Sequence, residues 1–180
     1  PSLNVFVQDI TKFEPTDTYD IIIIIGGLHH VFQHTQDVIA LMNKSLKPDG
    51  YFINFEPTED NALYRRLREK IYKKNDLFDE ETEQGFSLKT LNGYFEQSGF
   101  TSVDQMYPGL LSYMMYYNPD AFPALNIGKK GMVKFAFGLD KLFFRSWLGR
   151  KFSWATLTLW QKTSEIEIHQ TNANDYKDVA

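Results

Sequence analysis

One histidine stands where it could move a proton. Five successive isoleucines, Ile21 to Ile25, are followed by Gly26-Gly27 and then by Leu28-His29-His30. A histidine side chain ordinarily changes its protonation state at about pH 6.5, which suits a general base working near neutrality. His29 could therefore take a proton from a substrate hydroxyl.

A glutamate closes the next apolar segment of the chain. Tyr51–Phe55 predicts a strand, and Glu56-Pro57 follows it directly. Adjacent parallel strands lie about 4.8 Å apart, so side chains just past the ends of two such strands can approach one another. We therefore expect Glu56 to lie near His29 if these two strands are neighbours.

A short apolar segment near the start, Leu3–Val7, predicts another strand and is followed by Asp9-Ile10. Doubly wound sheets bind ligands at the carboxyl ends of their strands, where Asp9 would then stand. Gly26 and Gly27 could bring the backbone close to a ligand at the same edge. The alternatives are an ordinary turn at Asp9 and a tight strand exit at the two glycines.

The isoleucine run itself predicts the class of sheet. Such a sequence is typical of a strand buried on both faces, in a parallel sheet covered by helices. Residues 35–46 predict an amphipathic helix, and Lys47-Pro48-Asp49-Gly50 predicts a turn before the strand Tyr51–Phe55. Strand, helix and strand with short connections form a parallel βαβ unit.

The rest of the chain predicts further helices and strands. Ser87 could cap a helix that Gly99 ends. The elements expected there, in chain order, are a charged helix at 61–74, an acidic loop at 79–83, a helix at 87–98, strands at 100–107 and 154–160, and a disordered polar tail at 163–180.

Four segments together carry a family resemblance. They are Asp9-Ile10, Tyr19-Asp20-Ile21 through Leu28-His29-His30-Val31, Leu46-Lys47-Pro48-Asp49-Gly50, and Phe55-Glu56-Pro57. Their order and spacing resemble the second half of the core of class I S-adenosylmethionine-dependent methyltransferases of the type 11 or type 12 kind. The turn reads Leu-Lys-Pro-Asp-Gly, where that family has Leu-Lys-Pro-Gly-Gly.

The resemblance implies a fold. It is an α/β, Rossmann-like, doubly wound and mostly parallel sheet with an antiparallel closing strand, over residues 1–162. The chain begins at what would be the third strand, so the glycine-rich loop that binds the cofactor cannot be placed. We therefore expect an N-terminally incomplete core.

The resemblance also implies how the cofactor, S-adenosylmethionine, is bound. Asp9 would accept a hydrogen bond from the adenine amino group, and Ile10 would pack on the adenine ring. Gly26 and Gly27 would lie beside the methionyl part that carries the methyl group.

Catalytic roles follow from the same resemblance. In plant small-molecule O-methyltransferases with a similar loop, the histidine is the catalytic base, and a glutamate after the next strand positions it. Those roles fall to His29 and Glu56. A structural or substrate-contact role for His29 is the alternative.

The implied reaction is transfer of a methyl group to an oxygen or carbon of a small, apolar or aromatic acceptor. Two other functions stay open. A parallel sheet alone does not identify the cofactor, so a nicotinamide-dependent oxidoreductase is one alternative. The other is a non-catalytic or membrane-associated module on the same fold.

A segment at 129–151 combines basic with aromatic residues and allows two interpretations. It could belong to inserted cap helices, at about 109–151, that build the acceptor pocket. It could instead make peripheral contact with an anionic membrane surface. The aromatic run Tyr113, Tyr116, Tyr117 and Phe122 is consistent with an acceptor site or with an ordinary core.

Composition excludes several classes. The net charge of −4 gives no sign of nucleic-acid binding. The absence of cysteine excludes disulfides and thiolate metal sites, and His29, His30 and His34 lack the further ligands that zinc needs, so no metal is expected. No apolar run approaches the roughly 20 residues of a transmembrane helix, and a cytoplasmic protein is the expectation.

Overall fold

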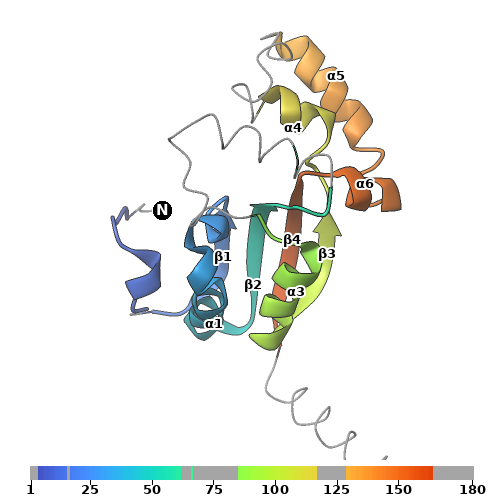
Figure 1. Cartoon of the computed structure of the whole chain (residues 1–180). Helices are drawn as coiled ribbons and strands as arrows, with labels where there is room; N and C mark the ends of the chain where they lie inside the picture. Colours follow the sequence, from blue (N-terminus) through green and yellow to red (C-terminus); the bar gives the residue numbers. More distant parts are fainter. Residues whose placement is uncertain (1–3, 16, 62–65, 67–84, 117–128, 164–180) are drawn as a thin grey trace, which may run out of the picture.

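Four strands form one mixed sheet at the centre of the structure (Figure 1). The computed structural model describes residues 4–15, 17–61, 66, 85–116 and 129–163. The strands are β1 (Tyr19–Ile25), β2 (Leu46–Pro57), β3 (Phe100–Met106) and β4 (Ala155–Lys162), and their order in the sheet is β1-β2-β4-β3.

The sheet is mostly antiparallel, so the predicted mostly parallel sheet is wrong. β1 and β2 pair in parallel as expected, whereas β4 runs antiparallel to both β2 and β3. The strand predicted at Leu3–Val7 is also wrong, because residues 4–9 form neither helix nor strand, while Leu3 lies outside the described residues. With that strand missing, β1–β2 is the one parallel pair in the described sheet, and the βαβ unit supplies it.

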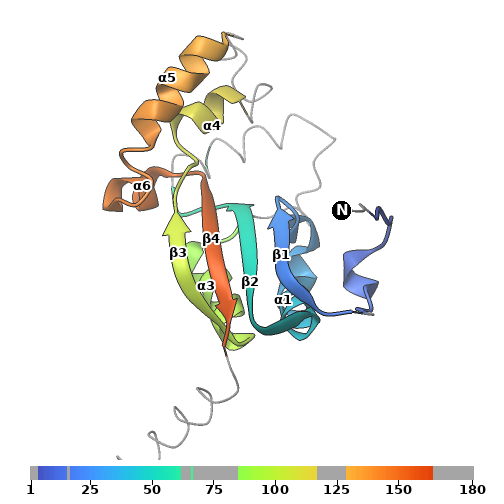
Figure 2. The same ribbon diagram turned by 180° about the vertical axis from the view of Figure 1, so that it is seen from behind.

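Two helices, α1 (Thr35–Ser45) and α3 (Leu88–Gln97), cover the same face of the sheet (Figures 1 and 2). Ile22 and Ile24 of β1 point toward that face and pack against the core. The other three isoleucines point the opposite way, because side chains alternate along a strand, and Ile21, Ile23 and Ile25 are 54%, 58% and 68% exposed. The expectation that this strand is buried on both faces by helices is therefore wrong for the described part of the chain.

Aromatic side chains make up much of the core between the sheet and the two helices. Phe95 of α3 and Trp160 of β4 are fully buried and stacked, with ring centroids 4.5 Å apart and planes 1° from parallel. Phe52 of β2 meets Phe95 edge-on at 5.1 Å. This cluster ties helix α3 to the two central strands.

Local sequence signals place the helix ends correctly. Ser87 accepts a hydrogen bond from the backbone of Thr90 at 3.0 Å, so it caps α3 as predicted. Gly99 follows the helix with φ +80°, a conformation that glycine adopts without strain. The helix predicted at 35–46 is α1.

The predicted turn at residues 47–50 lies within β2, which begins at Leu46. The strand register jumps there: Tyr19 is opposite Leu46, whereas Ile21 is opposite Tyr51. Asp49 has φ 59°, so the chain bends inside the first part of the strand. Predictions for residues 62–65, 67–84 and 117–128, among them Tyr117 and Phe122, and for the tail beyond Thr163 lie outside the described residues.

Three further helices lie beyond one end of the sheet (Figure 1). They are α4 (Leu111–Tyr116), α5 (Lys130–Asp140) and α6 (Trp147–Phe152). Two short 3-10 helices, η1 (Ile10–Lys12) and η2 (Leu28–His34), flank β1 in the sequence. In the described part of the chain, no helix has both the length and the apolar character needed to cross a membrane.

We predict that Phe95→Ala lowers the free energy of unfolding by about 3–5 kcal/mol, because it leaves a cavity against Trp160. Urea denaturation would measure the change. Lys89→Ala, on the exposed side of the same helix, is the control and should change stability by about 0.5 kcal/mol at most. A similar small effect for both variants would contradict the described packing.

We also predict an acid-dependent contribution from Asp104 of β3. Its hydrogen bond from Arg145, with Nε to Oδ1 at 3.2 Å, holds the pKa of Asp104 below its usual range. A carboxylate with a lowered pKa stabilises the fold above its unfolded pKa, and this contribution is lost as the pH falls through the folded pKa. Arg145→Gln should raise the pKa of Asp104 in an NMR titration while leaving that of Asp20, which Lys47 lowers, unchanged. An unaltered Asp104 titration would contradict the pairing.

Candidate functional site

A buried carboxylate organises the loop that follows β1. Glu56, near the end of β2, is fully buried. Its Oε1 accepts hydrogen bonds from the backbone of Gly27 at 3.0 Å and of Leu28 at 2.9 Å. Its Oε2 accepts one from the backbone of His29 at 3.3 Å and lies 2.9 Å from His29 Nδ1. The structure thus brings Glu56 and His29 together.

This contact determines which nitrogen of His29 can act. An ionised carboxylate only accepts hydrogen bonds, so the Nδ1 that faces Glu56 carries the hydrogen. In the neutral imidazole, Nε2 then holds a free lone pair. The His29 side chain is 15% exposed, and the His30 ring lies beside it with centroids 4.0 Å apart. Such a nitrogen can accept a proton from a bound hydroxyl.

Backbone conformation explains why residue 26 is a glycine, and close packing explains why residue 27 is one. Gly26 has φ +60°, and its backbone nitrogen donates to the Phe55 carbonyl at 2.7 Å. A Cβ on Gly26 would lie 3.7 Å from Cε1 of His29, so this residue faces the imidazole. A Cβ on Gly27 would come within 2.9 Å of the Ile24 side chain. The predicted cofactor role of both glycines stays a prediction.

Asp9 and Ile10 do not follow a strand, contrary to the expectation. Asp9 caps η1, and its carboxylate accepts hydrogen bonds from Thr11 N at 3.0 Å and Thr11 Oγ1 at 2.8 Å. These hydrogen bonds hold the pKa of Asp9 below its usual range. Ile10 is half-buried against the core. The Asp9 side chain is exposed, so its assignment to adenine stays a prediction.

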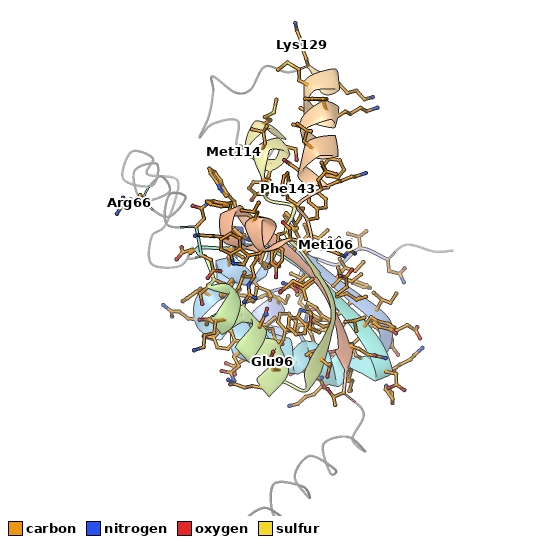
Figure 3. The ribbon with its side chains drawn as sticks, turned by 90° about the vertical axis from the view of Figure 1, so that its right-hand side faces the viewer. Arg66, Glu96, Met106, Met114, Lys129 and Phe143 are labelled. Carbon is orange, nitrogen blue, oxygen red and sulfur yellow. The ribbon has the colours of Figure 1, made fainter. Side chains whose placement is uncertain are left out.

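An apolar cavity of about 560 Å³ lies between the sheet and the helices α4 and α5. Figure 3 shows Met106 where β3 meets these helices and Lys129 at the far tip of α5. Among the described lining residues Lys134 is the one with a charge, and His29 is not among them. The lining residues are Phe55, Met106, Pro108, Ser112, Tyr113, Val133, Lys134, Phe137, Phe144 and Leu157.

Phe55 connects this cavity with the histidine loop. Its ring lines the cavity, its carbonyl accepts the hydrogen bond from Gly26, and the next residue is Glu56. Side chains alternate along β2, so Phe55 and Glu56 point to opposite faces of the sheet. The cavity and the His29–Glu56 pair therefore lie near the same end of β2 but on opposite faces of the sheet.

Asp140 joins the two cavity helices, and it is not among the site residues predicted from the sequence. Asp140 of α5 is buried, and its Oδ2 accepts hydrogen bonds from Ser112 N and Ser112 Oγ of α4, both at 2.7 Å. The signal was available, because Asp140 is the single acidic residue between positions 129 and 151. An isolated acid in a basic helix is a candidate for a buried partner.

The described residues supply no set of metal ligands around His29, His30 and His34. Within the described ranges, no group of three or more histidine, aspartate or glutamate side chains is placed to hold a metal ion. His34 lies instead at the end of η2, directly before α1.

Comparisons with known proteins identify the fold. No family model and no curated protein matches the sequence. Two solved structures each match with a TM-score of 0.53, and the alignment covers 58% of each of those chains. A putative sarcosine dimethylglycine methyltransferase from Galdieria sulphuraria is 13% identical over 87% of this chain, and mycolic acid cyclopropane synthase CmaA1, solved with S-adenosylhomocysteine and CTAB, is 14% identical over 85%.

A third match is an O-methyltransferase family 2 protein from Planctomyces limnophilus, solved with apigenin. It has a TM-score of 0.50 and 15% identity, and the alignment covers 87% of this chain and 34% of that one. At these identities the likeness concerns the fold. The chain has part of the fold of class I S-adenosylmethionine-dependent methyltransferases, and it spans little more than half the length of the two best-covered structures above.

Proposed function

We propose that this protein transfers the methyl group of S-adenosylmethionine to an oxygen or carbon of a small, apolar or aromatic acceptor, with His29 as the general base. The observation that carries the proposal is the Glu56 carboxylate, which holds Nδ1 of His29 at 2.9 Å and fixes the backbone of the loop around it. The fold supports it, since the similar structures include methyltransferases.

In this proposal, Glu56 positions His29 and stabilises its charged form. Nε2 of His29 accepts the proton of the acceptor hydroxyl as the oxygen becomes a nucleophile. The positive charge that develops on the imidazole lies next to the buried carboxylate, which lowers its free energy. Most of the acceleration would come from alignment of the reacting atoms, with proton removal as a second contribution.

The residues at the end of β1 fit a closely bound cofactor better than those of η1 do. Gly26 faces His29 without a side chain between them, so a ligand could approach the backbone there. Gly26 and Gly27 would flank the methionyl part, and the exposed Asp9 with Ile10 would hold adenine. When bound, S-adenosylmethionine supplies the methyl group: its sulfur–carbon bond breaks, a bond from that carbon to the acceptor forms, and S-adenosylhomocysteine is released.

The cavity beside Phe55 is the proposed acceptor site, and the segment at about 109–151 is its cap. Of the lining residues that the structure describes, all but Lys134 are uncharged, and most are apolar or aromatic. A cavity of about 560 Å³ suits a small organic molecule. One similar protein was solved with apigenin, an aromatic molecule, and another with CTAB, a surfactant with a long alkyl chain, which supports an acceptor with aromatic or apolar parts.

Cofactor binding can be tested by calorimetric titration of S-adenosylhomocysteine. The titration uses this chain and the same chain with any residues that precede it in its gene. Asp9→Ala should weaken binding roughly 10- to 100-fold, because a hydrogen bond to a charged group is lost. Asp17→Ala, at another exposed acid, is the control. Binding of a nicotinamide dinucleotide in place of S-adenosylhomocysteine would favour the oxidoreductase alternative.

Catalysis can be tested with labelled S-adenosylmethionine and a panel of phenols and other apolar acceptors. His29→Ala should lower methyl transfer roughly 100-fold or more and leave the affinity for S-adenosylhomocysteine nearly unchanged. Glu56→Gln should lower both turnover and stability, the latter by about 1–3 kcal/mol, because the amide replaces one acceptor oxygen of a fully used carboxylate. His34→Ala is the matched control. Loss of cofactor affinity in a folded His29→Ala protein would count against the role as base.

A further inference from the structure

Helix α5 has apolar side chains on two sides, and the residues of one of these sides are all exposed. Val133 and Phe137 line the cavity, and Ala136 is buried. On the other side Met132, Phe135 and Leu139 follow one another at spacings of three and four residues, and all three are exposed. Helices that are apolar around their circumference are ordinarily buried. The outer side of α5 thus lacks an apolar neighbour in the described structure.

The exposed side continues beyond the helix. Leu142 follows Leu139 at the same spacing and is 74% exposed, whereas Phe135 is 70% exposed and Trp147 of α6 is 68% exposed. We call this set the apolar ridge: Met132, Phe135, Leu139, Leu142 and Trp147. Single exposed apolar residues are normal, but this many in one segment of the chain favour a contact surface.

Charge indicates what covers the ridge. Residues 129–151 contain seven lysines and arginines and one acid, the buried Asp140, for a net charge of +6. The whole chain carries −4, so all other residues together carry −10. One lysine lies beside a ridge residue: Lys151 Nζ is 5.0 Å from the ring centroid of Trp147. Lys141 Nζ lies 4.9 Å from the ring centroid of Phe137, which lines the cavity.

We propose that the apolar ridge, together with the lysines of residues 129–151, binds the surface of an anionic lipid bilayer. Apolar side chains would enter the region below the headgroups, and the lysines would contact the anionic headgroups. The −10 carried by the rest of the chain would be repelled by the same surface, so the protein would dock in one orientation. This inference does not rest on the proposed methyl transfer.

The chain carries its own probe of the contact. Trp147 is exposed, whereas Trp154 and Trp160 are buried at 6% and 0% exposure. Vesicles of phosphatidylcholine with phosphatidylserine should therefore shift Trp147 emission to shorter wavelength, and vesicles of phosphatidylcholine alone should shift it much less. Trp147→Phe should abolish the shift while the protein still sediments with the anionic vesicles.

Two pairs of variants separate charge from apolar contact in co-sedimentation. Lys130→Gln, Lys141→Gln and Lys151→Gln combined should weaken binding on the order of 100-fold. The control combines Lys12→Gln, Lys44→Gln and Lys89→Gln, which removes the same charge from other exposed positions. Phe135→Ser should weaken binding on the order of 10-fold, with Val103→Ser, an exposed residue of β3, as its control.

Circular dichroism of each variant excludes unfolding as the cause. Preference for anionic vesicles, with loss only in the ridge and lysine variants, would support the proposal. Equal loss in the control variants, no binding to anionic vesicles, or equal binding to neutral ones would overturn it. So would a concentration-dependent dimer that Phe135→Ser abolishes, because a second copy of the chain would then be the occupant.

Discussion

The carboxylate of Glu56 is the group on which the arrangement of the site depends. A buried charge is strongly unfavourable unless hydrogen bonds replace the lost water. Here three backbone N–H groups and one imidazole nitrogen do so, and all of them come from the loop after β1. The loop has to turn sharply around one side chain, which Gly26 permits through its positive φ. The parallel pairing of β1 with β2 and the orientation of His29 are parts of the same arrangement.

Elements with a strong local signal could be predicted from the sequence. Helix α1 follows from its apolar spacing, and α3 follows from its Ser87 cap and its Gly99 end, because these signals act within a few residues. The strand predicted at 3–7 is wrong because an apolar segment becomes a strand only if a partner strand pairs with it, and the segment itself does not show whether one does. The isoleucine run shows the same limit: its sequence predicts a strand, but whether both faces are covered depends on residues elsewhere in the fold.

Some features of the candidate site could likewise be predicted from the sequence, and others could not. The approach of Glu56 to His29 could be anticipated because Glu56 lies near the end of β2 and His29 follows the end of β1, and these two strands are parallel neighbours. The full set of hydrogen-bond donors to Glu56 could not be anticipated, since a sequence does not show which backbone N–H groups will face a given side chain. The cavity could not be predicted either, because its wall combines residues far apart in the sequence, such as Leu157 of β4 and Val133 of α5. Asp140 gave a signal by being the single acid among basic residues, but its partner Ser112 did not.

Gly109 and the residues around it have a consequence for how the protein can diversify. The backbone of Trp154 donates to the Gly109 carbonyl at 2.7 Å, and Ser153 Oγ accepts from Gly109 N at 2.8 Å. A Cβ at Gly109 would overlap the backbone nitrogen of Ala155, so the two chain segments touch. The helices α4, α5 and α6 therefore belong to an insertion between β3 and β4 whose first and last residues are in contact with each other. Because loop-closure entropy grows slowly with length, such an insertion can lengthen, shorten or be exchanged for another without a change in strand register. The ligand preference of the proposed acceptor site can then evolve in one interchangeable segment while the histidine and its carboxylate stay as they are.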